Sequence, residues 1–391
     1  MLGTPFPPWP SFSEADAAAV ADVLRSGRVN YWTGQQGREF EREFAAWAGS
    51  AHAIALNNGT VALDAALHGL RIKAGDEVVV TPRSFIASVS SVVLAGATPL
   101  FADVDRDDQN LTAESIAAVL TPRTRAVVVV HLAGWPAQMD GILALAREKG
   151  LAVIEDCAQA NGATYRGRNV GTLGDVGAWS FCQDKIITTG GEGGMVTTDD
   201  RELWSRMWSY KDHGKSWDAV YGREHPPGFR WVHESFGTNG RMIEMQSVIG
   251  RRQLALLPEW SARRRANADA IWDAARESPG VRAPVVPAWI EHGAYRAYAF
   301  VEPAALRADW SRDRVIAEIV ARDVPCYAGS CSEIYRERAF EGTGFAPRER
   351  LPVAHELGDT SLMFLVHPTL EPVHVDRTCE ALRDVMRRAV R

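Results

Sequence analysis

Residues 77–157 alternate valine-rich apolar runs with stretches of helical patterning. Apolar runs of this length, separated by helices of moderate length, are typical of a mostly parallel β-sheet with crossover connections. Ligands of such sheets lie beyond the carboxyl ends of the strands. The sequence therefore predicts an α/β fold with its ligand site at the strand ends. The predicted strands cover residues 77–82, 97–104, 125–134 and 151–157.

The chain has 391 residues, of which 46% are hydrophobic and 24% are charged, which is typical of globular proteins and sufficient for two domains. Its net charge of −6 indicates neither a nucleic-acid nor a membrane partner. The N-terminus lacks a signal-peptide pattern, and no apolar run is long enough to span a membrane. The five cysteines are scattered without metal-binding spacing, so we expect free thiols, a reducing cytoplasm and no metal site.

The segment from Leu151 to Asp199 carries residues that suggest a particular chemistry. Asp156 ends an apolar strand, Ser180 follows in Trp-Ser-Phe, and Lys185 lies in a polar turn rich in glycine. A pyridoxal phosphate (PLP) site needs such a pair, because the lysine forms a Schiff base and the acid pairs with the pyridine nitrogen. Only five of the 43 basic residues are lysines, and arginine cannot form a Schiff base. We therefore interpret Lys185 as reactive rather than as a surface lysine.

Two sequence blocks identify a family. E-D-C-A-Q-A at 155–160 and S-F-C-Q-D-K-I-I-T-T-G-G-E-G-G at 180–194 resemble the pattern of the DegT-like nucleotide-sugar aminotransferases, which are fold-type-I PLP enzymes. The resemblance covers nearly the whole chain. It implies an aspartate-aminotransferase-like α/β fold, with a large domain on a mostly parallel sheet and a smaller α+β C-terminal domain.

The resemblance assigns roles around the cofactor ring. Lys185 binds the cofactor and moves protons during catalysis, while Asp156 keeps the pyridine nitrogen protonated. Phe85 stacks on the ring, although an isolated aromatic residue is more often part of a core. Gln159 lies over the ring near its phenolic oxygen, with a surface amide as the alternative interpretation.

A phosphate site is predicted where a short strand, the turn Asn57-Asn58-Gly59-Thr60 and a helix follow one another. Free N–H groups and the helix dipole favour an anion there. A plain helix cap by Asn58 or Thr60 explains the same residues. The family has Ser-Gly-Thr at this place to grip the PLP phosphate. The resemblance therefore implies that Asn58 (in place of the serine), Gly59 and Thr60 hold the phosphate together with Ser180.

Residues 237–242 match the family pattern G-x-N-x-R-M. In the family this asparagine, here Asn239, reaches across a dimer interface to the partner's PLP phosphate, whereas a turn with a helix cap is the simpler alternative. His213, in Asp-His-Gly, resembles a family position near the substrate. The resemblance thus implies a homodimer whose sites are shared between subunits.

Three regions are predicted along the chain. Residues 1–12, rich in proline and aromatic residues, form an N-terminal arm. Residues 13–257 form the large PLP-binding domain and residues 258–391 the small C-terminal domain, with the change at Pro258. The aromatic and polar segment 203–235 is too irregular for a core helix throughout, and we interpret it as a loop over the site.

The resemblance implies the activity of an aminotransferase. By analogy an amino group passes from L-glutamate, through pyridoxamine phosphate, to a keto sugar linked to a nucleotide, as in the biosynthesis of polysaccharides or antibiotics. Two alternatives remain. Relatives that dehydrate deoxysugars carry a histidine in place of the lysine, and Lys185 disfavours that reaction. A PLP-binding sensor would need a DNA-binding or signalling module, for which we see no spare segment.

Overall fold

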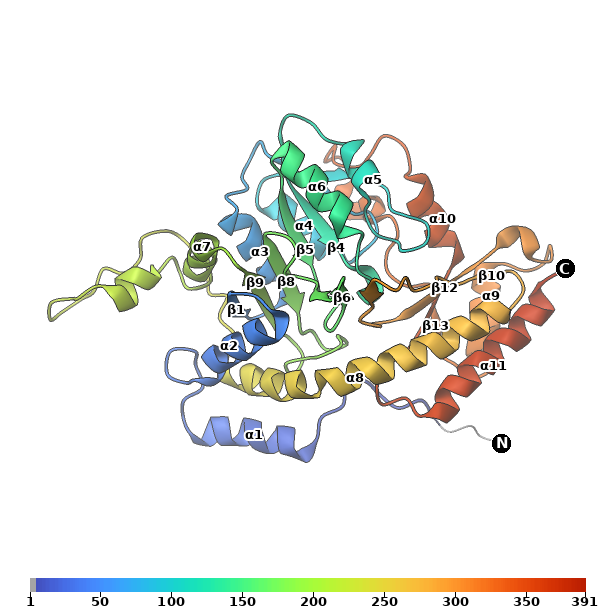
Figure 1. Cartoon of the computed structure of the whole chain (residues 1–391), viewed down its shortest axis with the longest axis horizontal. Coiled ribbons are helices and arrows are strands. Elements are labelled where there is room, and N and C mark those ends of the chain that lie inside the picture. The colour runs from blue at the N-terminus through green and yellow to red at the C-terminus, as the bar shows by residue number, and fades with distance from the viewer. Residues whose placement is uncertain (1–4) are drawn as a thin grey trace.

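The computed structural model describes residues 5–391 and has a seven-stranded sheet at its centre (Figure 1). Its strands are β1 (His52–Leu56), β2 (Glu77–Val80), β3 (Thr98–Phe101), β4 (Thr124–Val130), β5 (Ala152–Asp156), β8 (Val176–Ser180) and β9 (Gly194–Thr198). Across the sheet they follow the order β1-β9-β8-β5-β4-β2-β3. Strand β9 is antiparallel to both neighbours and the other pairs are parallel. The predicted α/β class with a mostly parallel sheet is therefore confirmed.

Helices cover both faces of this sheet. They are α2 (Gln36–Ala48), α3 (Gly59–Gly69), α4 (Ala87–Leu94), α5 (Ala113–Ala117), α6 (Met139–Lys149) and α7 (Arg201–Lys211). In β2, Val78 and Val80 join the core formed with α3, α4 and α7, whereas Val79 joins the core formed with α2, α5 and α6. Successive strand residues point to opposite faces, so the strands are buried on both sides. The ends of the strands are then the places where a ligand can reach the sheet.

One predicted loop begins as a helix. Within segment 203–235, the residues up to Lys211 belong to α7, whose N-cap Asp200 accepts hydrogen bonds from the N–H groups of Glu202 (2.7 Å) and Leu203 (3.0 Å). Leu203, Trp204, Met207 and Trp208 are buried, and this helical spacing of aromatic and apolar residues explains the difference. Residues 212–243, which follow α7, contain a short π turn and no strand, and the middle of this segment extends away from the body of the protein (Figure 1).

The C-terminal region is organised around α8 (Glu244–Glu277). This helix packs on α2 and on α1 (Glu14–Arg25) near its start and on α11 (Pro372–Ala389) near its end (Figure 1). It passes Pro258 without a break, so a single helix joins the two predicted domains and a boundary at Pro258 stays a prediction.

Two small sheets complete the fold. One, of strands between residues 281 and 364, has the order β10-β12-β14-β13, and the other, with the order β11-β6-β7, pairs residues 290–291 with the hairpin at residues 164–169. No helix within residues 5–391 is long and apolar enough to cross a membrane. The remaining elements are β6 (Thr164–Tyr165), β7 (Arg168–Asn169), β10 (Val281–Arg282), β11 (Ile290–Glu291), β12 (Ala297–Val301), β13 (Cys326–Tyr327), β14 (Ser361–Phe364), α9 (Arg312–Val320), α10 (Pro352–Thr360), and short 3₁₀ or π turns at Leu132–Gly134, Asp218–Gly222, Pro303–Ala305, Ile334–Arg336 and Arg338–Phe340.

The described part of the predicted arm, residues 5–12, packs on the chain's own C-terminal region. The indole N–H of Trp9 donates a 2.9 Å hydrogen bond to the carbonyl of Lys185, and the Trp9 ring meets that of Trp260 edge to face at 5.2 Å. The carbonyl of Pro5 lies 3.0 Å from Nε2 of His374 in α11. The arm therefore connects α8 and α11 to the turn that carries Lys185.

Candidate active site

A cavity of about 910 Å³ lies at the carboxyl ends of the central strands. Val130, Asp156 and Ser180, the last residues of β4, β5 and β8, line it. The strand-end location expected from the sequence is therefore where the structure places the cavity. Most of the predicted site residues line it together: Asn58, Gly59, Thr60, Phe85, Asp156, Gln159, Ser180 and Lys185.

Asp156 is a buried carboxylate with room for another donor. Its Oδ2 accepts a 2.7 Å hydrogen bond from the hydroxyl of Ser88, and its Oδ1 accepts one of 3.1 Å from the N–H of Ala158. Only 5% of the residue is exposed, and it forms no ion pair within the described residues. A buried carboxylate gains most from a cationic hydrogen-bond donor, which a protonated pyridine nitrogen provides.

Phe85 and Gln159 offer a ring platform and a donor. Phe85 lines the cavity with 67% of its surface exposed, which is unusual for a phenylalanine but suits a stacking partner. Gln159 is 6% exposed, and its Oε1 accepts a 2.7 Å hydrogen bond from the N–H of Ala133. Because the oxygen is used in this way, the amide NH₂ group is the part available to an acceptor such as a phenolic oxygen.

The start of α3 (Asn58, Gly59 and Thr60) packs closely against Ser180, and these four residues form one corner of the cavity. Asn58 is the N-cap, with its Oδ1 accepting a 2.9 Å hydrogen bond from the N–H of Val61, so the simple capping role is observed for its side chain. A Cβ at Gly59 would lie 2.6 Å from Cβ of Ser180, and glycine is therefore required there. The first N–H groups of a helix lack partners within the helix, and here they stand next to a hydroxyl. This set fits a phosphate group.

Lys185 shares the cavity with an aromatic and ionic group. Its Nζ lies 5.0 Å from the centre of the Tyr295 ring. The Tyr295 hydroxyl donates a hydrogen bond to Asp184, and Nη2 of Arg296 lies 3.1 Å from the same carboxylate oxygen. Burial raises the pKa of Asp184, but the bond from Tyr295 and the charges of Lys185 and Arg296 outweigh it and hold that pKa below its usual value. Asp184 is therefore ionised beside the lysine.

His213 and Asn239, two of the predicted residues, lie outside this cavity. Both are exposed on segment 212–243, where the N–H of His213 donates a 3.0 Å hydrogen bond to the carbonyl of Thr238. Asp212 joins the two ends of this segment, because its carboxylate forms ion pairs with Nη1 of Arg241 (2.6 Å) and Nζ of Lys215 (3.1 Å). Their predicted roles stay predictions, since a single chain brings neither residue to its own cavity.

Four residues of the site were not predicted: Ser88, Asp184, Tyr295 and Arg296. Tyr295 and Asp184 form a hydrogen bond although 111 positions separate them in the sequence, and no local pattern predicts that contact. Ser88 faces Asp156 from a helix whose other positions are mostly apolar. The position of Asp184 next to Lys185 was the one available signal.

A buried group that resembles a metal site has another explanation. Ligand atoms of His131, Glu155 and Cys157 lie within 4.8 Å of one another. Nδ1 of His131 accepts the N–H of Ala137 (3.0 Å), so its Nε2 carries the proton and donates to Glu155 (3.0 Å). Burial raises the pKa of Cys157 well above its usual value, which keeps it a neutral thiol. The group is a hydrogen-bonded support of the sheet.

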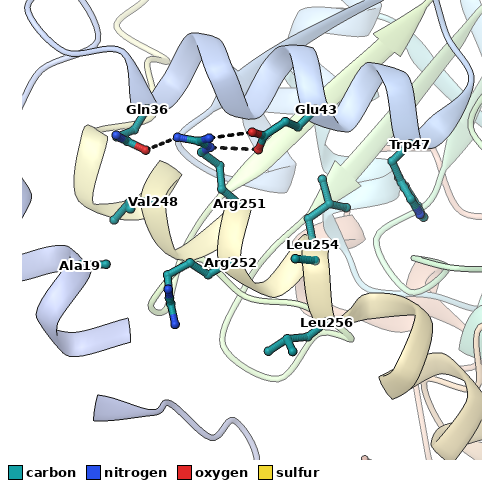
Figure 2. A pocket seen from close by; sticks show the side chains of 10 residues that line it. Ala19, Gln36, Glu43, Trp47, Val248, Arg251, Arg252, Leu254 and Leu256 are labelled. Atoms are coloured by element: carbon teal, nitrogen blue, oxygen red, sulfur yellow. Dashed lines mark hydrogen bonds and ion pairs between the residues drawn. The ribbon is translucent and has the colours of Figure 1, made fainter. Parts of the chain in front are cut away.

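A second hollow of about 690 Å³ lies between α1, α2 and α8 (Figure 2). Its Arg251 is held by two hydrogen bonds to Glu43 (2.6 and 2.9 Å) and one to Gln36 (2.6 Å), as Figure 2 shows. Arg252 pairs with Asp16 at 2.5 Å. Both arginines are therefore engaged within the chain, and the reactive groups lie in the first cavity.

Residues 329–337 line part of the first cavity, and Glu333 fixes their position. It accepts hydrogen bonds from the Tyr335 hydroxyl (2.6 Å) and Nε of Arg350 (2.9 Å). The bond from Arg350 lowers the pKa of Glu333 from 4.5 to about 2, although burial acts in the opposite direction. The carboxylate thus contributes stability only while it is ionised.

We expect this contribution to disappear in acid. A carboxyl group with a lowered folded-state pKa stabilises the fold above its unfolded pKa, and the effect is lost as pH falls from about 4.5 to about 2. Glu333→Gln should therefore lower the melting temperature by about 2 °C or more at neutral pH. The difference from wild type should shrink across that acid range in thermal unfolding series. Glu341→Gln, an exposed change just beyond residues 329–337, is the control. A difference in melting temperature that is independent of pH would contradict the assignment.

Comparisons with known proteins match this chain to aminotransferases over most of its length. The sequence profile of the DegT/DnrJ/EryC1/StrS aminotransferase family matches residues 10–383. The dTDP-3-amino-3,4,6-trideoxy-alpha-D-glucose transaminase of Streptomyces venezuelae is 35% identical over 95% of this chain and 92% of that protein. The UDP-N-acetyl-3-dehydro-alpha-D-glucosamine 3-aminotransferase of Acidithiobacillus ferrooxidans is 43% identical, over 61% of each chain.

Solved structures show the same fold. The aminotransferase from Psychrobacter cryohalolentis is 58% identical with a TM-score of 0.97, covering 98% of this chain and all of that one. DesV of S. venezuelae, solved with a ketimine intermediate, is 34% identical with a TM-score of 0.85 and covers 97% of this chain and 98% of that one. The predicted aspartate-aminotransferase-like fold is thereby confirmed. The chain belongs to the DegT/DnrJ/EryC1/StrS family of pyridoxal-phosphate-dependent aminotransferases.

Proposed function

We propose that the protein transfers an amino group from L-glutamate to a keto sugar linked to a nucleotide. The observation that carries this proposal is that Lys185 and the buried carboxylate of Asp156 share one cavity at the strand ends. The named activities of relatives, which include transaminases of dTDP- and UDP-linked sugars, support the acceptor class. A cavity of about 910 Å³ has room for the cofactor and part of a substrate.

The residues that line the cavity suit the phosphate, the ring face and the ring nitrogen of PLP. The corner of Asn58, Gly59, Thr60 and Ser180 would hold the phosphate, Phe85 the ring face and Asp156 the ring nitrogen. When bound, PLP supplies an electron-accepting ring that stabilises negative charge at the α-carbon of the amino donor. Asp156 keeps that ring cationic, because its carboxylate is buried and accepts only neutral donors from the chain.

Lys185 acts as the general base and acid. Its Nζ takes the proton from the α-carbon of the amino donor and, in the second half-reaction, returns a proton to the carbon that carried the sugar keto group. The ionised Asp184 and the face of the Tyr295 ring lie next to this amine and orient it. Lys185 also disfavours the dehydratase alternative, in which a histidine stands at this position.

We propose a homodimer with shared sites. The middle of segment 212–243 projects from the body (Figure 1). The segment exposes Phe229 (75%), Trp231 (84%) and Phe236 (96%). Large exposed aromatic side chains that lie close together mark interaction surfaces. Asn239 lies on the same segment, outside its own cavity, and would reach the phosphate corner of the partner.

We also propose that the protein works in a reducing cytoplasm, because its five cysteines are free thiols.

Shared sites make a prediction for mixed dimers. Asn239→Ala should weaken PLP retention by about tenfold or more, because one hydrogen bond to a charged group is lost. Mixing Asn239→Ala chains with Lys185→Ala chains should restore one complete site in each hybrid dimer. Transaminase activity of the refolded mixture measures this against the sum of the two parents. Activity no greater than that sum would contradict sharing.

The proposed function is tested by supplying both substrates. The purified protein with PLP and L-glutamate should release 2-oxoglutarate and change its visible spectrum. Addition of nucleotide-linked keto sugars should yield an amino sugar, detected by mass spectrometry. A spectral change with glutamate and no aminated product from any sugar nucleotide would keep the aminotransferase and reject the sugar acceptor. The absence of any spectral change with PLP and glutamate would reject the donor.

A further inference from the structure

The cavity wall beside Lys185 carries an arginine, Arg296, which is not among the residues that the sequence assigns to the cofactor. Arg296 directly precedes β12 and lines the cavity, with 11% of its side chain exposed. Its Nη1 donates to the carbonyl of Tyr295 (2.9 Å), and its Nη2 lies 3.1 Å from Asp184. A guanidinium has five N–H donors in a planar fork, so further donors remain for a ligand.

A second arginine lies behind it without a carboxylate partner. Arg264 of α8 is fully buried, and within the described chain its Nε and Nη2 have no hydrogen-bond partner. Its Nη1 donates only a long bond of 3.4 Å to the carbonyl of Ala294, and its guanidinium lies 4.8 Å from the Trp9 ring. A buried cation of this kind is costly unless an anion compensates it.

The positive charges of these arginines lower the pKa values of neighbouring basic groups. Burial, and next the charge of Arg296, lowers the pKa of Arg264 to about 9. Burial, and next the charges of Arg264 and Arg296, lowers the pKa of His367 to about 3, so this histidine stays neutral. Asp184 forms an ion pair with Arg296, and within the described residues neither Arg264 nor Lys185 has a carboxylate at ion-pair distance. This wall has an excess of positive charge that suits an anionic ligand.

The geometry of the reaction selects which anion this is. The phosphate of the cofactor is accounted for by the corner at α3 and Ser180. The α-carboxylate of the amino donor is bonded directly to the carbon from which Lys185 takes a proton, so it must lie close to Lys185 Nζ. Arg296 belongs to the group around that nitrogen, through Asp184 and Tyr295. The diphosphate of a sugar nucleotide is separated from the reacting carbon by atoms of the sugar ring.

We propose that Arg296, with Arg264 behind it, binds the α-carboxylate of the amino donor. This rests on the function proposed above and adds the residue that selects an amino acid over a simple amine. The planar fork of arginine matches a carboxylate with two parallel hydrogen bonds. Asp184 holds the fork in place, and the uncompensated charge of Arg264 raises the local attraction for an anion.

Arg296→Gln tests this in the first half-reaction alone. The half-saturating concentration of L-glutamate, read from the visible spectrum, should rise by about 10- to 100-fold, as expected for the loss of a charge-assisted pair. The KM for the sugar nucleotide, measured with the pyridoxamine-phosphate form, should stay unchanged. Arg296→Lys, which keeps the charge without the fork, should fall between the two. Arg276→Gln, an exposed change on α8, is the matched control.

A measurement without turnover separates binding from chemistry. Glutarate, a dicarboxylate without an amino group, should bind wild type in calorimetry and should bind Arg296→Gln more weakly by a similar factor. An unchanged glutamate response, or a rise confined to the KM of the sugar nucleotide, would overturn the proposal, and the second result would assign the arginine to the diphosphate. If Arg296→Gln fails to fold, Arg296→Lys and its glutarate affinity decide. Glutamate-dependent spectra without any accepted sugar would reject the proposed acceptor while leaving this inference standing.

Discussion

Lys185→Ala should reduce amino transfer by at least about 10³-fold, because the change removes both the covalent attachment point of the cofactor and the group that moves the proton. The visible absorption that reports attachment to Nζ should disappear, while PLP should still bind through the corner of Gly59, Thr60 and Ser180. Reconstituted protein is compared with wild type by absorption spectrum, by bound phosphate and by release of 2-oxoglutarate.

Two controls make this result specific to the amine of Lys185. Lys149→Ala removes an exposed lysine, 47% of whose side chain is accessible, and should leave spectrum and rate unchanged. Lys185→Arg keeps a positive charge near Asp184 but cannot attach the cofactor, so it should be as inactive as the alanine variant. A Lys185→Ala protein that transfers amino groups within tenfold of the wild-type rate would remove Lys185 from its role.

The sequence predicts those parts of the site that follow a regular pattern. Strands with a continuous apolar run, such as β4 and β5, are recognisable, and parallel strands bring their carboxyl ends to one edge. The position of Asp156 at this edge therefore follows from the sequence pattern alone, whereas the strand that ends at Ser180 was not predicted. Gly59 was also predictable, since a glycine between a strand and a helix signals close packing, here against Ser180.

The contacts that the sequence does not reveal are those made between distant segments. Tyr295 and Arg296 reach the lysine turn from the beginning of β12, and Trp9 reaches it from the N-terminal arm across 176 residues. Neither contact follows from local periodicity, because tertiary packing alone decides which loop ends face each other. The same limit applies to Asn239, whose predicted role depends on a second chain, and to His213, whose predicted place near the substrate stays a prediction.

Two parts of the chain supply different groups to the cavity. The central sheet supplies the fixed groups that suit the cofactor, namely the phosphate corner and Asp156, from strand ends buried on both faces. The segments after α8 supply Tyr295, Arg296 and several of residues 329–337, which line the same cavity. A change within residues 329–337 should therefore leave the contacts of Asp156 and Gly59 in place, whereas a change at Tyr295 or Arg296 also alters the contacts of Asp184 next to Lys185.

Asp156→Asn should lower the rate of amino transfer by about 100-fold, equivalent to about 2.7 kcal/mol, with little loss of bound cofactor. Asparagine has the same shape and can still accept the hydrogen bond from Ser88, but it lacks the negative charge that keeps the ring nitrogen protonated. Rates of both half-reactions and the amount of bound PLP measure the effect. Ser88→Ala removes one hydrogen bond while leaving the carboxylate, so a much smaller decrease is expected. Asp140→Asn, at an exposed surface ion pair, should change neither quantity. A near-normal rate for Asp156→Asn, or an equal loss in Ser88→Ala, would show that the charge of this carboxylate is not what drives the reaction.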